Sequence, residues 1–239
     1  MSFSHPWSAF AEVQVVNSFA ELVATPFAGA VNALCWPREL AGDFGEVVAQ
    51  VVALGGGDDI TTLDEEDLMA LSLGARGREA RAVLIEDLRR LTQHGLQPSL
   101  DCFGRLTRDE SGGPVSTDVQ SWHVDAAPVI VDTYLCSYTT ASSEGLRTAD
   151  ALLCTEIPAV RAALLAEYGG ADDDGFRAYL REQYYDLHYE AAAGAVPFAF
   201  GFGNMWRIAN QCPGSPVPPC VHRAPSPPAG APPRLLLIS

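Results

Sequence analysis

The chain has 239 residues, 48% of them hydrophobic, and carries a formal net charge of −15. This length and composition predict one globular domain with a packed core and argue against a disordered chain. All 15 basic residues are arginines, which excludes chemistry that needs a lysine, such as a Schiff base or a Walker phosphate loop. The acidic balance also disfavours nucleic acid and anionic membranes as partners.

Neither a membrane segment nor an export signal is evident in the sequence. No run of about 18 or more apolar residues occurs, and the N-terminus, MSFSHPWSAF, lacks a basic region followed by an apolar block. We therefore expect a cytoplasmic protein. The six cysteines include no CxxC pair, which argues against zinc ribbons and thioredoxin-like chemistry. Cys212 and Cys220 bracket the loop CPGSPVPPC, and the spacing leaves open whether they pair.

Helical patterns dominate residues 1–97. Apolar spacing predicts helices over 8–27 and 39–54, and Thr62 precedes a glutamate by three residues, as in a capping box. The strongest pattern covers 77–96, where apolar residues occupy one side and arginines the other. We expect these segments to form an N-terminal helical layer.

After Pro98 the pattern changes to short β-rich segments, interrupted by a second helical block. The predicted strands are 99–109, 119–125, 128–138, 195–203 and 234–239, and the predicted helices between them are 147–154, 157–168 and 173–191.

These elements predict an α+β fold in a single domain, residues 1–239. A double-stranded β-helix, or jelly roll, is the closed core that best suits short antiparallel strands, here from 98–142 and 195–239. Residues 143–194 would form a helical insertion. Because the insertion is rich in aromatic residues and separates the candidate site residues in the chain, we expect it to act as a lid over a pocket.

The stretch SWHVDAAPVIVDTYLCSY contains the most informative pair, His123 and Asp125. Residues i and i+2 of a strand point to the same face, so an imidazole and a carboxylate would project together. His222 lies near the C-terminus and could complete a facial triad of two histidines and one carboxylate, which binds Fe(II) and leaves three positions open. Arg234, at the head of the last predicted strand, is a candidate for binding an anion.

The sequence resembles a bacterial family catalogued as domain of unknown function 1826. The resemblance covers roughly residues 30–239 and is carried by VNALCWPREL, the His-x-Asp pair, APVIVDTY, VHRAPS and RLLLIS. A Gly-Pro-Gly-Thr stretch of that family is replaced here by LCSYTTASSEGL, so no substrate can be transferred. The C-terminal pattern is also similar to Fe(II) and 2-oxoglutarate-dependent oxygenases of the double-stranded β-helix class.

These resemblances imply that His123, Asp125 and His222 are both the metal ligands and the catalytic centre. They further imply that Arg234 pairs with the distal carboxylate of 2-oxoglutarate, with the Tyr134 hydroxyl as a second donor. Further candidates for the substrate pocket are Trp122, Tyr138, Trp206 and His188. On the helix predicted for this segment, Asp186 and His188 would diverge and could not share a metal.

The implied activity is that of a non-haem iron dioxygenase or hydroxylase. It would use Fe(II), O2 and 2-oxoglutarate to oxidise a C–H bond of a small molecule, as in specialised metabolism, by hydroxylation, desaturation or cyclisation. Two alternatives stay open. One is an iron oxygenase in which the substrate chelates the metal without 2-oxoglutarate, and the other is a non-catalytic zinc-binding protein.

Overall fold

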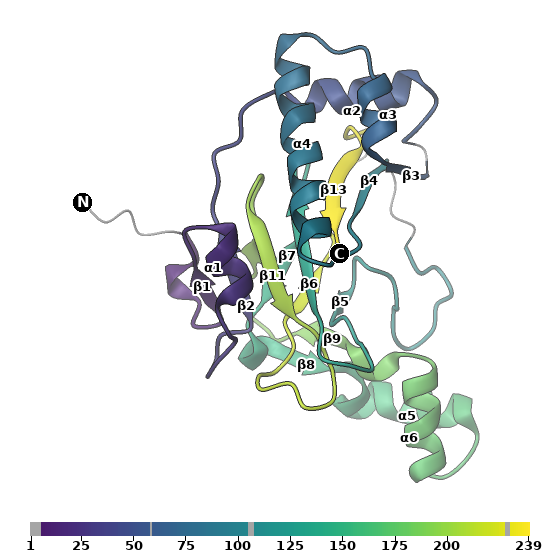
Figure 1. Ribbon diagram of the computed structural model, residues 1–239. Coiled ribbons are helices and arrows are strands. Elements are labelled where there is room, and N and C mark those ends of the chain that lie inside the picture. Colours follow the sequence, from purple (N-terminus) through teal and green to yellow (C-terminus); the bar gives the residue numbers. More distant parts are fainter. Residues whose placement is uncertain (1–5, 58, 105–107, 228–229) are drawn as a thin grey trace.

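The computed structural model describes residues 6–57, 59–104, 108–227 and 230–239. Two β-sheets, one of seven strands and one of six, form its body in a mixed α+β arrangement (Figure 1). The order of the seven-stranded sheet is β1 (Val13–Val15), β2 (Ala33–Trp36), β11 (Met205–Ala209), β6 (Asp132–Ser137), β13 (Arg234–Ile238), β4 (Ser99–Phe103) and β3 (Ile60–Leu63). The order of the six-stranded sheet is β10 (Phe198–Ala199), β7 (Glu144–Leu146), β12 (Val221–Arg223), β5 (Trp122–His123), β9 (His188–Ala191) and β8 (Ala151–Leu153). Neighbouring strands are antiparallel except β1 and β2.

Helices pack mainly on the outside of this pair of sheets. The α-helices are α1 (Phe19–Ala24), α2 (Phe44–Ala53), α3 (Glu65–Ala70), α4 (Ala75–Gln93), α5 (Pro158–Tyr168) and α6 (Asp174–Glu182). Short 3₁₀ helices span Pro6–Ala9, Thr148–Asp150, Cys154–Glu156 and Tyr185–Leu187. In the described part of the chain, no helix combines the length and apolarity needed to cross a bilayer.

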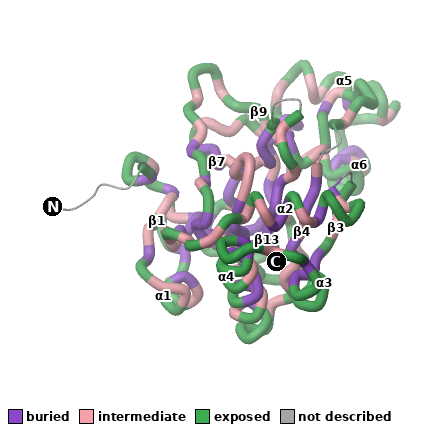
Figure 2. Tube along the Cα trace, turned by 90° about the horizontal axis from the view of Figure 1, so that it is seen from above, coloured by how far each residue is buried: buried purple, intermediate pink, exposed green. Residues whose placement is uncertain are grey.

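Helix α4 confirms the strongest of the helical predictions. It buries Ala80, Leu84 and Leu91 fully, and these residues join a core that includes Leu100 and Leu235 of the seven-stranded sheet. Gly95 follows the helix with φ of 85°, a left-handed conformation that glycine adopts without steric cost. Figure 2 shows the result, with buried residues along the strands and exposed residues on the outer sides of the helices.

Strand β6 shows how the seven-stranded sheet separates two environments. Tyr134 and Cys136 belong to the core beneath α4, whereas Leu135 belongs to a second core with Phe200 and Trp206 on the opposite face. Because strand side chains alternate between faces, Thr133 and Ser137 share the face of Leu135. That face looks toward the six-stranded sheet, and it contributes to the candidate site described below.

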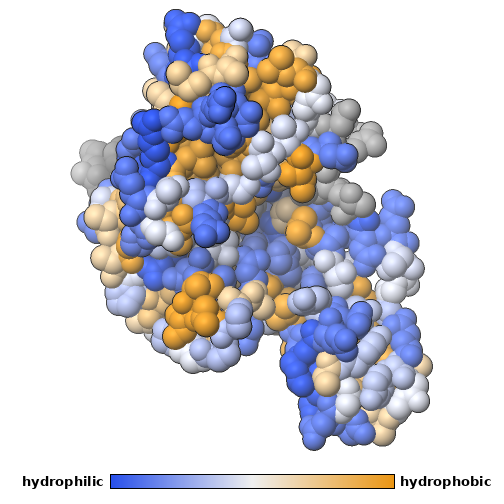
Figure 3. Space-filling model, turned by 45° about the vertical axis from the view of Figure 1, so that its right-hand side comes forward, coloured by the Kyte–Doolittle hydropathy of each residue, from blue (hydrophilic) through white to orange (hydrophobic). Residues whose placement is uncertain are grey.

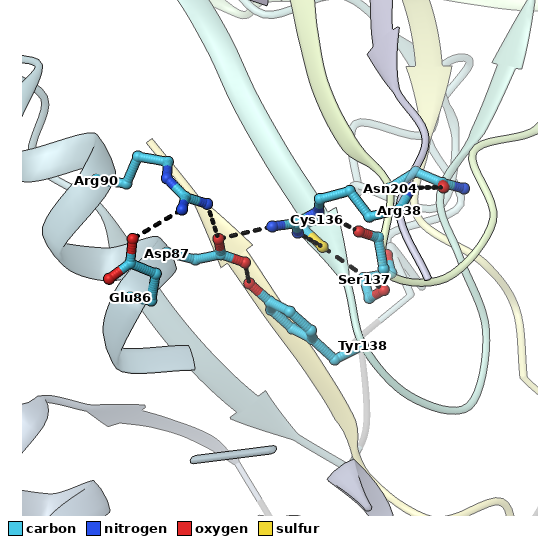
Figure 4. Close-up of polar contacts among 9 residues, drawn as sticks. Arg38, Glu86, Asp87, Arg90, Cys136, Ser137, Tyr138 and Asn204 are labelled. Carbon is cyan, nitrogen blue, oxygen red and sulfur yellow. Dashed lines mark hydrogen bonds and ion pairs between the residues drawn. The ribbon is translucent and has the colours of Figure 1, made fainter. Parts of the chain in front are cut away.

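A buried ionic cluster fastens α4 to the seven-stranded sheet (Figure 4). The Asp87 side chain is only 1% exposed and accepts hydrogen bonds from Arg38 at 2.7 Å, Arg90 at 3.1 Å and the Tyr138 hydroxyl at 2.8 Å. Burial, foremost, raises the pKa of Tyr138 well above its usual value, so the phenol stays protonated as a donor. The cluster satisfies a carboxylate that would otherwise be costly to bury.

We expect Asp87→Asn to lower the free energy of unfolding by about 2–3 kcal/mol, because it removes the charge that two guanidinium groups share. Urea unfolding monitored by circular dichroism measures this change. The matched control is Glu86→Ala, one residue away, whose carboxylate also pairs with Arg90 but is 60% exposed. Its loss should cost less than about 0.5 kcal/mol. An equal decrease in the free energy of unfolding of both variants would show that the buried cluster stabilises the fold no more than an exposed ion pair does.

The N-terminal segment differs from the predicted helical layer. The predicted helix over 8–27 is instead β1 followed by the six-residue α1, and β2 and β3 were not predicted. All three strands add to the seven-stranded sheet, where pairing overrides a local helical pattern. The capping box lies two residues later than expected, with Asp64 as N-cap and Asp67 as its partner.

The segment 143–194 also contains strands where helices were predicted. The helix expected over 147–154 is a 3₁₀ turn and β8, and the one expected over 173–191 ends at Glu182. Tyr184 has φ of 62°, which ends the helix and lets β9 pair with β5 and β8. Helix α5 was predicted correctly, as was the last strand, β13.

The predicted strand over 99–109 ends at Phe103, and residues 105–107 lie outside the described part of the chain. The strands predicted over 119–125, 128–138 and 195–203 are shorter in the structure, and β11 was not predicted. All six cysteines are buried and carry free thiols, so Cys212 and Cys220 do not pair.

Candidate metal centre

His123, Asp125 and His222 converge on one point. His123 in β5 and His222 in β12 are direct cross-strand partners, and their ring centroids are 4.5 Å apart. Asp125 follows His123 by two residues, and its Oδ2 lies 3.8 Å from His222 Nε2. One ligand atom from each residue lies within 4.8 Å of the others. The three donors of a facial triad are mutually cis, and at bond lengths of about 2.1 Å they are about 3.0 Å apart, so the side chains must rotate inward to share one ion.

Main-chain carbonyls orient both imidazoles. His123 Nδ1 lies 2.8 Å from the carbonyl oxygen of Ser121, and His222 Nδ1 lies 3.2 Å from that of Cys220. A carbonyl oxygen only accepts hydrogen bonds, so in the neutral rings Nδ1 carries the proton and Nε2 keeps a free lone pair. This arrangement is the usual one for histidines that bind metal through Nε2.

The Asp125 carboxylate is held from the other sheet. The Thr133 hydroxyl of β6 donates to Asp125 Oδ2 at 2.7 Å and lies 3.0 Å from Asn210 Oδ1. The Gln211 amide also donates to the main-chain carbonyl of Asp125 at 2.7 Å. The candidate centre therefore lies between the two sheets, with both histidines on one sheet and the carboxylate anchored to the other. Thr133 lies in the stretch APVIVDTY, which carries the family resemblance, but no role was predicted for it, and Asn210 had no distinguishing signal in the sequence.

Burial favours the neutral form of His123. Desolvation first, and then the neighbouring His222, lowers its pKa to about 4, although the Ser121 carbonyl and Asp125 oppose the shift. A neutral imidazole at physiological pH has the lone pair that a metal needs. The electrostatics of the pair therefore suit a bound cation.

This shift predicts how the stability of the metal-free protein depends on pH. An unfolded histidine takes up its proton near pH 6.5, whereas folded His123 does so only near pH 4. The free energy of unfolding should therefore fall as pH drops from about 6.5 to 4, with a contribution on the order of 2–3 kcal/mol from His123. Urea titrations across this range measure it, and His123→Gln should show a shallower fall. Parallel curves for the two proteins would contradict the assignment.

Arg234 is a buried cation placed between the sheets. It is 5% exposed, and its Nη2 donates to Ser137 of β6 at 2.8 Å and to Ser143, next to β7, at 2.7 Å. Its Nε has no hydrogen-bond partner, and none of the described carboxylates forms an ion pair with it. Desolvation lowers the pKa of Arg234 to about 10, so it remains charged at neutral pH. An unpaired buried guanidinium with a free donor suits an anionic ligand.

The other predicted residues lie elsewhere. Tyr134 of β6 and Tyr138, directly after β6, point toward α4 and away from Arg234, so the structure does not place the Tyr134 hydroxyl beside the guanidinium. Trp206 packs in the core between the sheets, with its ring centroid 4.3 Å from that of Phe200. Trp122 faces away from His123, beneath the Arg223 guanidinium at 4.3 Å.

His188 lies closer to the candidate centre than the predicted helix implied. In β9 it is the cross-strand partner of His123, and the two ring centroids are 6.0 Å apart. The helix predicted over this residue was wrong, because His188 lies in a strand, but Asp186 and His188 are not among the residues that converge on one point. His222, His123 and His188 form a row across three adjacent strands.

The helices of the insertion form a lobe of their own. Helices α5 and α6 enclose a separate apolar cluster around Leu164, Phe176 and Leu180. This lobe lies at the lower right in Figures 1 and 3 and has a largely hydrophilic surface. Four of the residues that follow it line a pocket together with His123, namely Gln183, Tyr184, Leu187 and His188. The role of the insertion as a lid stays a prediction.

The donor set of the centre fits a first-row divalent metal. Two imidazoles and one carboxylate match the facial triad of non-haem iron sites, and the same set also suits zinc. Such a triad occupies one face of an octahedron and leaves room for further ligands.

Comparisons with known proteins add little to this picture. No protein-family model matches the chain, so the resemblance to family 1826 is not confirmed, and no curated protein matches. Among solved structures, the chain is similar to the apo Kdo hydroxylase KdoO, described as a non-heme Fe(II) alphaketoglutarate dependent dioxygenase. The TM-score is 0.39, with 13% identity over 96% of this chain and 85% of that chain. A TM-score this low supports no argument about activity.

Proposed function

We propose that this chain is a mononuclear non-haem Fe(II) oxygenase that uses 2-oxoglutarate to oxidise a C–H bond of a small molecule. The observation that carries the proposal is the convergence of His123, Asp125 and His222. The two histidines are fixed by strand pairing and by carbonyls at Nδ1, and the carboxylate is fixed by Thr133. Side chains held in this way are organised for a metal before it binds.

Arg234 supports 2-oxoglutarate as the co-substrate. Its guanidinium is buried, lacks an acidic partner among the described residues and keeps Nε free. Ser137 beside it and Thr133 beside Asp125 lie on the same face of β6, four residues or about 13 Å apart along the strand. The length of 2-oxoglutarate, together with its bonds to a metal at one end and to a guanidinium at the other, is similar to this separation.

In the proposed reaction, R–H, O2 and 2-oxoglutarate yield R–OH, succinate and CO2. One oxygen atom enters the alcohol and the other enters succinate. Oxidation of the C–H bond supplies two of the four electrons that reduce O2, and oxidative decarboxylation of 2-oxoglutarate supplies the other two. The bound iron would supply the activation of O2. The chain itself contributes the fixed triad and the cation for the distal carboxylate, and burial between the two packed sheets shields that cation from water.

The test is to incubate the protein with Fe(II), O2 and 2-oxoglutarate and to measure succinate and O2 consumption. We expect slow Fe(II)-dependent formation of succinate even without the primary substrate, and none with Zn(II). Tight Fe(II) binding without any effect of 2-oxoglutarate would favour the oxygenase whose substrate chelates the metal. Tight binding of Zn(II) together with no reaction of Fe(II) and O2 would favour the non-catalytic zinc protein.

A further inference from the structure

A pocket of about 230 Å³ opens beside the candidate metal centre. Its walls come from the loop before β5, from β5 itself and from the segment that leads into β9. Among the lining residues are His123, Tyr184 and His188. His123 therefore belongs both to the metal centre and to this pocket. The volume equals that of roughly eight water molecules, so the pocket suits a small polar molecule or one end of a larger one.

His188 is a buried polar side chain of this pocket, and its neighbour in the lining, Asp118, pairs with Arg108. His188 is only 7% exposed, and strand pairing with His123 sets it on the same face of the sheet as the metal ligands. Its Nδ1 lies 2.9 Å from the carbonyl oxygen of Tyr184. Tyr184 has φ of 62°, a conformation that residues other than glycine rarely adopt, and this turn aims its carbonyl at the His188 ring.

The Tyr184 carbonyl also determines whether His188 Nε2 donates or accepts a hydrogen bond. Because the carbonyl only accepts, the neutral ring carries its proton on Nδ1 and presents Nε2 as an acceptor. None of the described residues forms a hydrogen bond with Nε2. A group that binds there must therefore offer an O–H or N–H donor.

We infer that this pocket is the primary-substrate subsite, and that His188 Nε2 accepts a hydrogen bond from a hydroxyl or amino group of the substrate. The inference rests on the proposed function for the chemistry that follows binding. In that reaction the oxidised C–H bond lies near the donor group, since His188 adjoins the ligand His123. The substrate class is thus a small alcohol, polyol or amine, or a molecule that ends in one.

Fragment binding observed by NMR tests this inference with three matched probes. Ethane-1,2-diol and 2-aminoethanol carry donors, whereas 1,2-dimethoxyethane has the same backbone without any. We expect saturable binding of at least one donor probe to wild-type protein, both metal-free and loaded with Zn(II). The dimethoxy compound should not bind. The response of the two donor probes distinguishes an alcohol from an amine.

Two variants separate hydrogen bonding from a structural role. His188→Phe keeps a ring but loses the acceptor, and should weaken binding of the donor probe by about fivefold to tenfold. His188→Gln keeps an acceptor and should retain most of the affinity. Both should bind Zn(II) as wild type does. Absence of probe binding to wild type, or equal binding to His188→Phe, would overturn the inference. Neither result would affect the proposed iron chemistry, whereas loss of Fe(II) binding with intact probe binding would refute only the proposed function.

Discussion

Replacing His222 with alanine should abolish iron-dependent turnover and weaken Fe(II) binding by more than about a hundredfold. His222 supplies one of three convergent donors, and its partner across the strands is the ligand His123. Loss of even an outer partner of a metal ligand costs about 10- to 100-fold in affinity, so loss of a ligand should cost more. Isothermal titration calorimetry with Fe(II) under anaerobic conditions measures the affinity directly.

The matched control is His94→Ala. His94 is an exposed histidine at the C-terminal cap of α4, in contact with aromatic rings and absent from the convergent group. Its removal should leave the Fe(II) affinity unchanged. Wild-type affinity in the His222 variant, or an equal loss in both variants, would show that iron does not bind at this centre.

Replacing Arg234 with glutamine should weaken 2-oxoglutarate binding by about 30-fold to several thousand-fold, the equivalent of about 2–5 kcal/mol for one member of a buried charge pair. Fe(II) binding should stay nearly intact, because Arg234 is not among the convergent ligands. Calorimetric titration of 2-oxoglutarate into the anaerobic Fe(II) protein measures this effect.

The same substitution has a second, independent consequence. Since Arg234 is buried without an acidic partner, the folded protein already bears the desolvation cost of its charge. We therefore expect Arg234→Gln to leave the free energy of unfolding unchanged or higher, which separates a binding role from a structural one.

Arg223→Gln is the control for the affinity measurement. Arg223 follows His222 directly but pairs with Glu144 and covers Trp122 on the other face of the sheet. Its variant should bind 2-oxoglutarate as wild type does. An unchanged affinity in Arg234→Gln would mean that another group binds the co-substrate or that 2-oxoglutarate is not used.

His123 and Asp125 could be grouped from the sequence because they are two residues apart in the chain, and the scarcity of histidines left few choices for a third member. In the structure β5 ends at His123, so Asp125 lies just beyond the strand, and the pairing of β12 with β5 brings His222 to both residues. The long helix α4 and the last strand β13 were predictable because each has a strong pattern of its own.

The elements that the sequence did not predict depend on pairing partners. Strands β1, β8 and β9 are short edge or near-edge strands with weak patterns of their own, and β9 is a strand because it completes a row beside β5. His188 was therefore expected on a helix. Of the two serines at Arg234, Ser137 lies in β6 and Ser143 lies just before β7 of the other sheet, and no local pattern could have linked them.

The sequence also did not predict which face of β6 each side chain occupies. Tyr134 follows Thr133 in the chain, and the choice between them for a site near the metal depends on which face of β6 meets the second sheet. The structure gives that face to Thr133 and turns Tyr134 toward α4. A shift of the alternation by one residue would have reversed the assignment.

The most direct test of the account is the visible absorption spectrum of the anaerobic protein on addition of Fe(II) and then 2-oxoglutarate. We predict a weak metal-to-ligand charge-transfer band that needs both additions, is absent in His222→Ala and requires far more 2-oxoglutarate in Arg234→Gln. A wild-type protein that binds Fe(II) and 2-oxoglutarate without this band would contradict chelation of 2-oxoglutarate by an iron held at His123, Asp125 and His222.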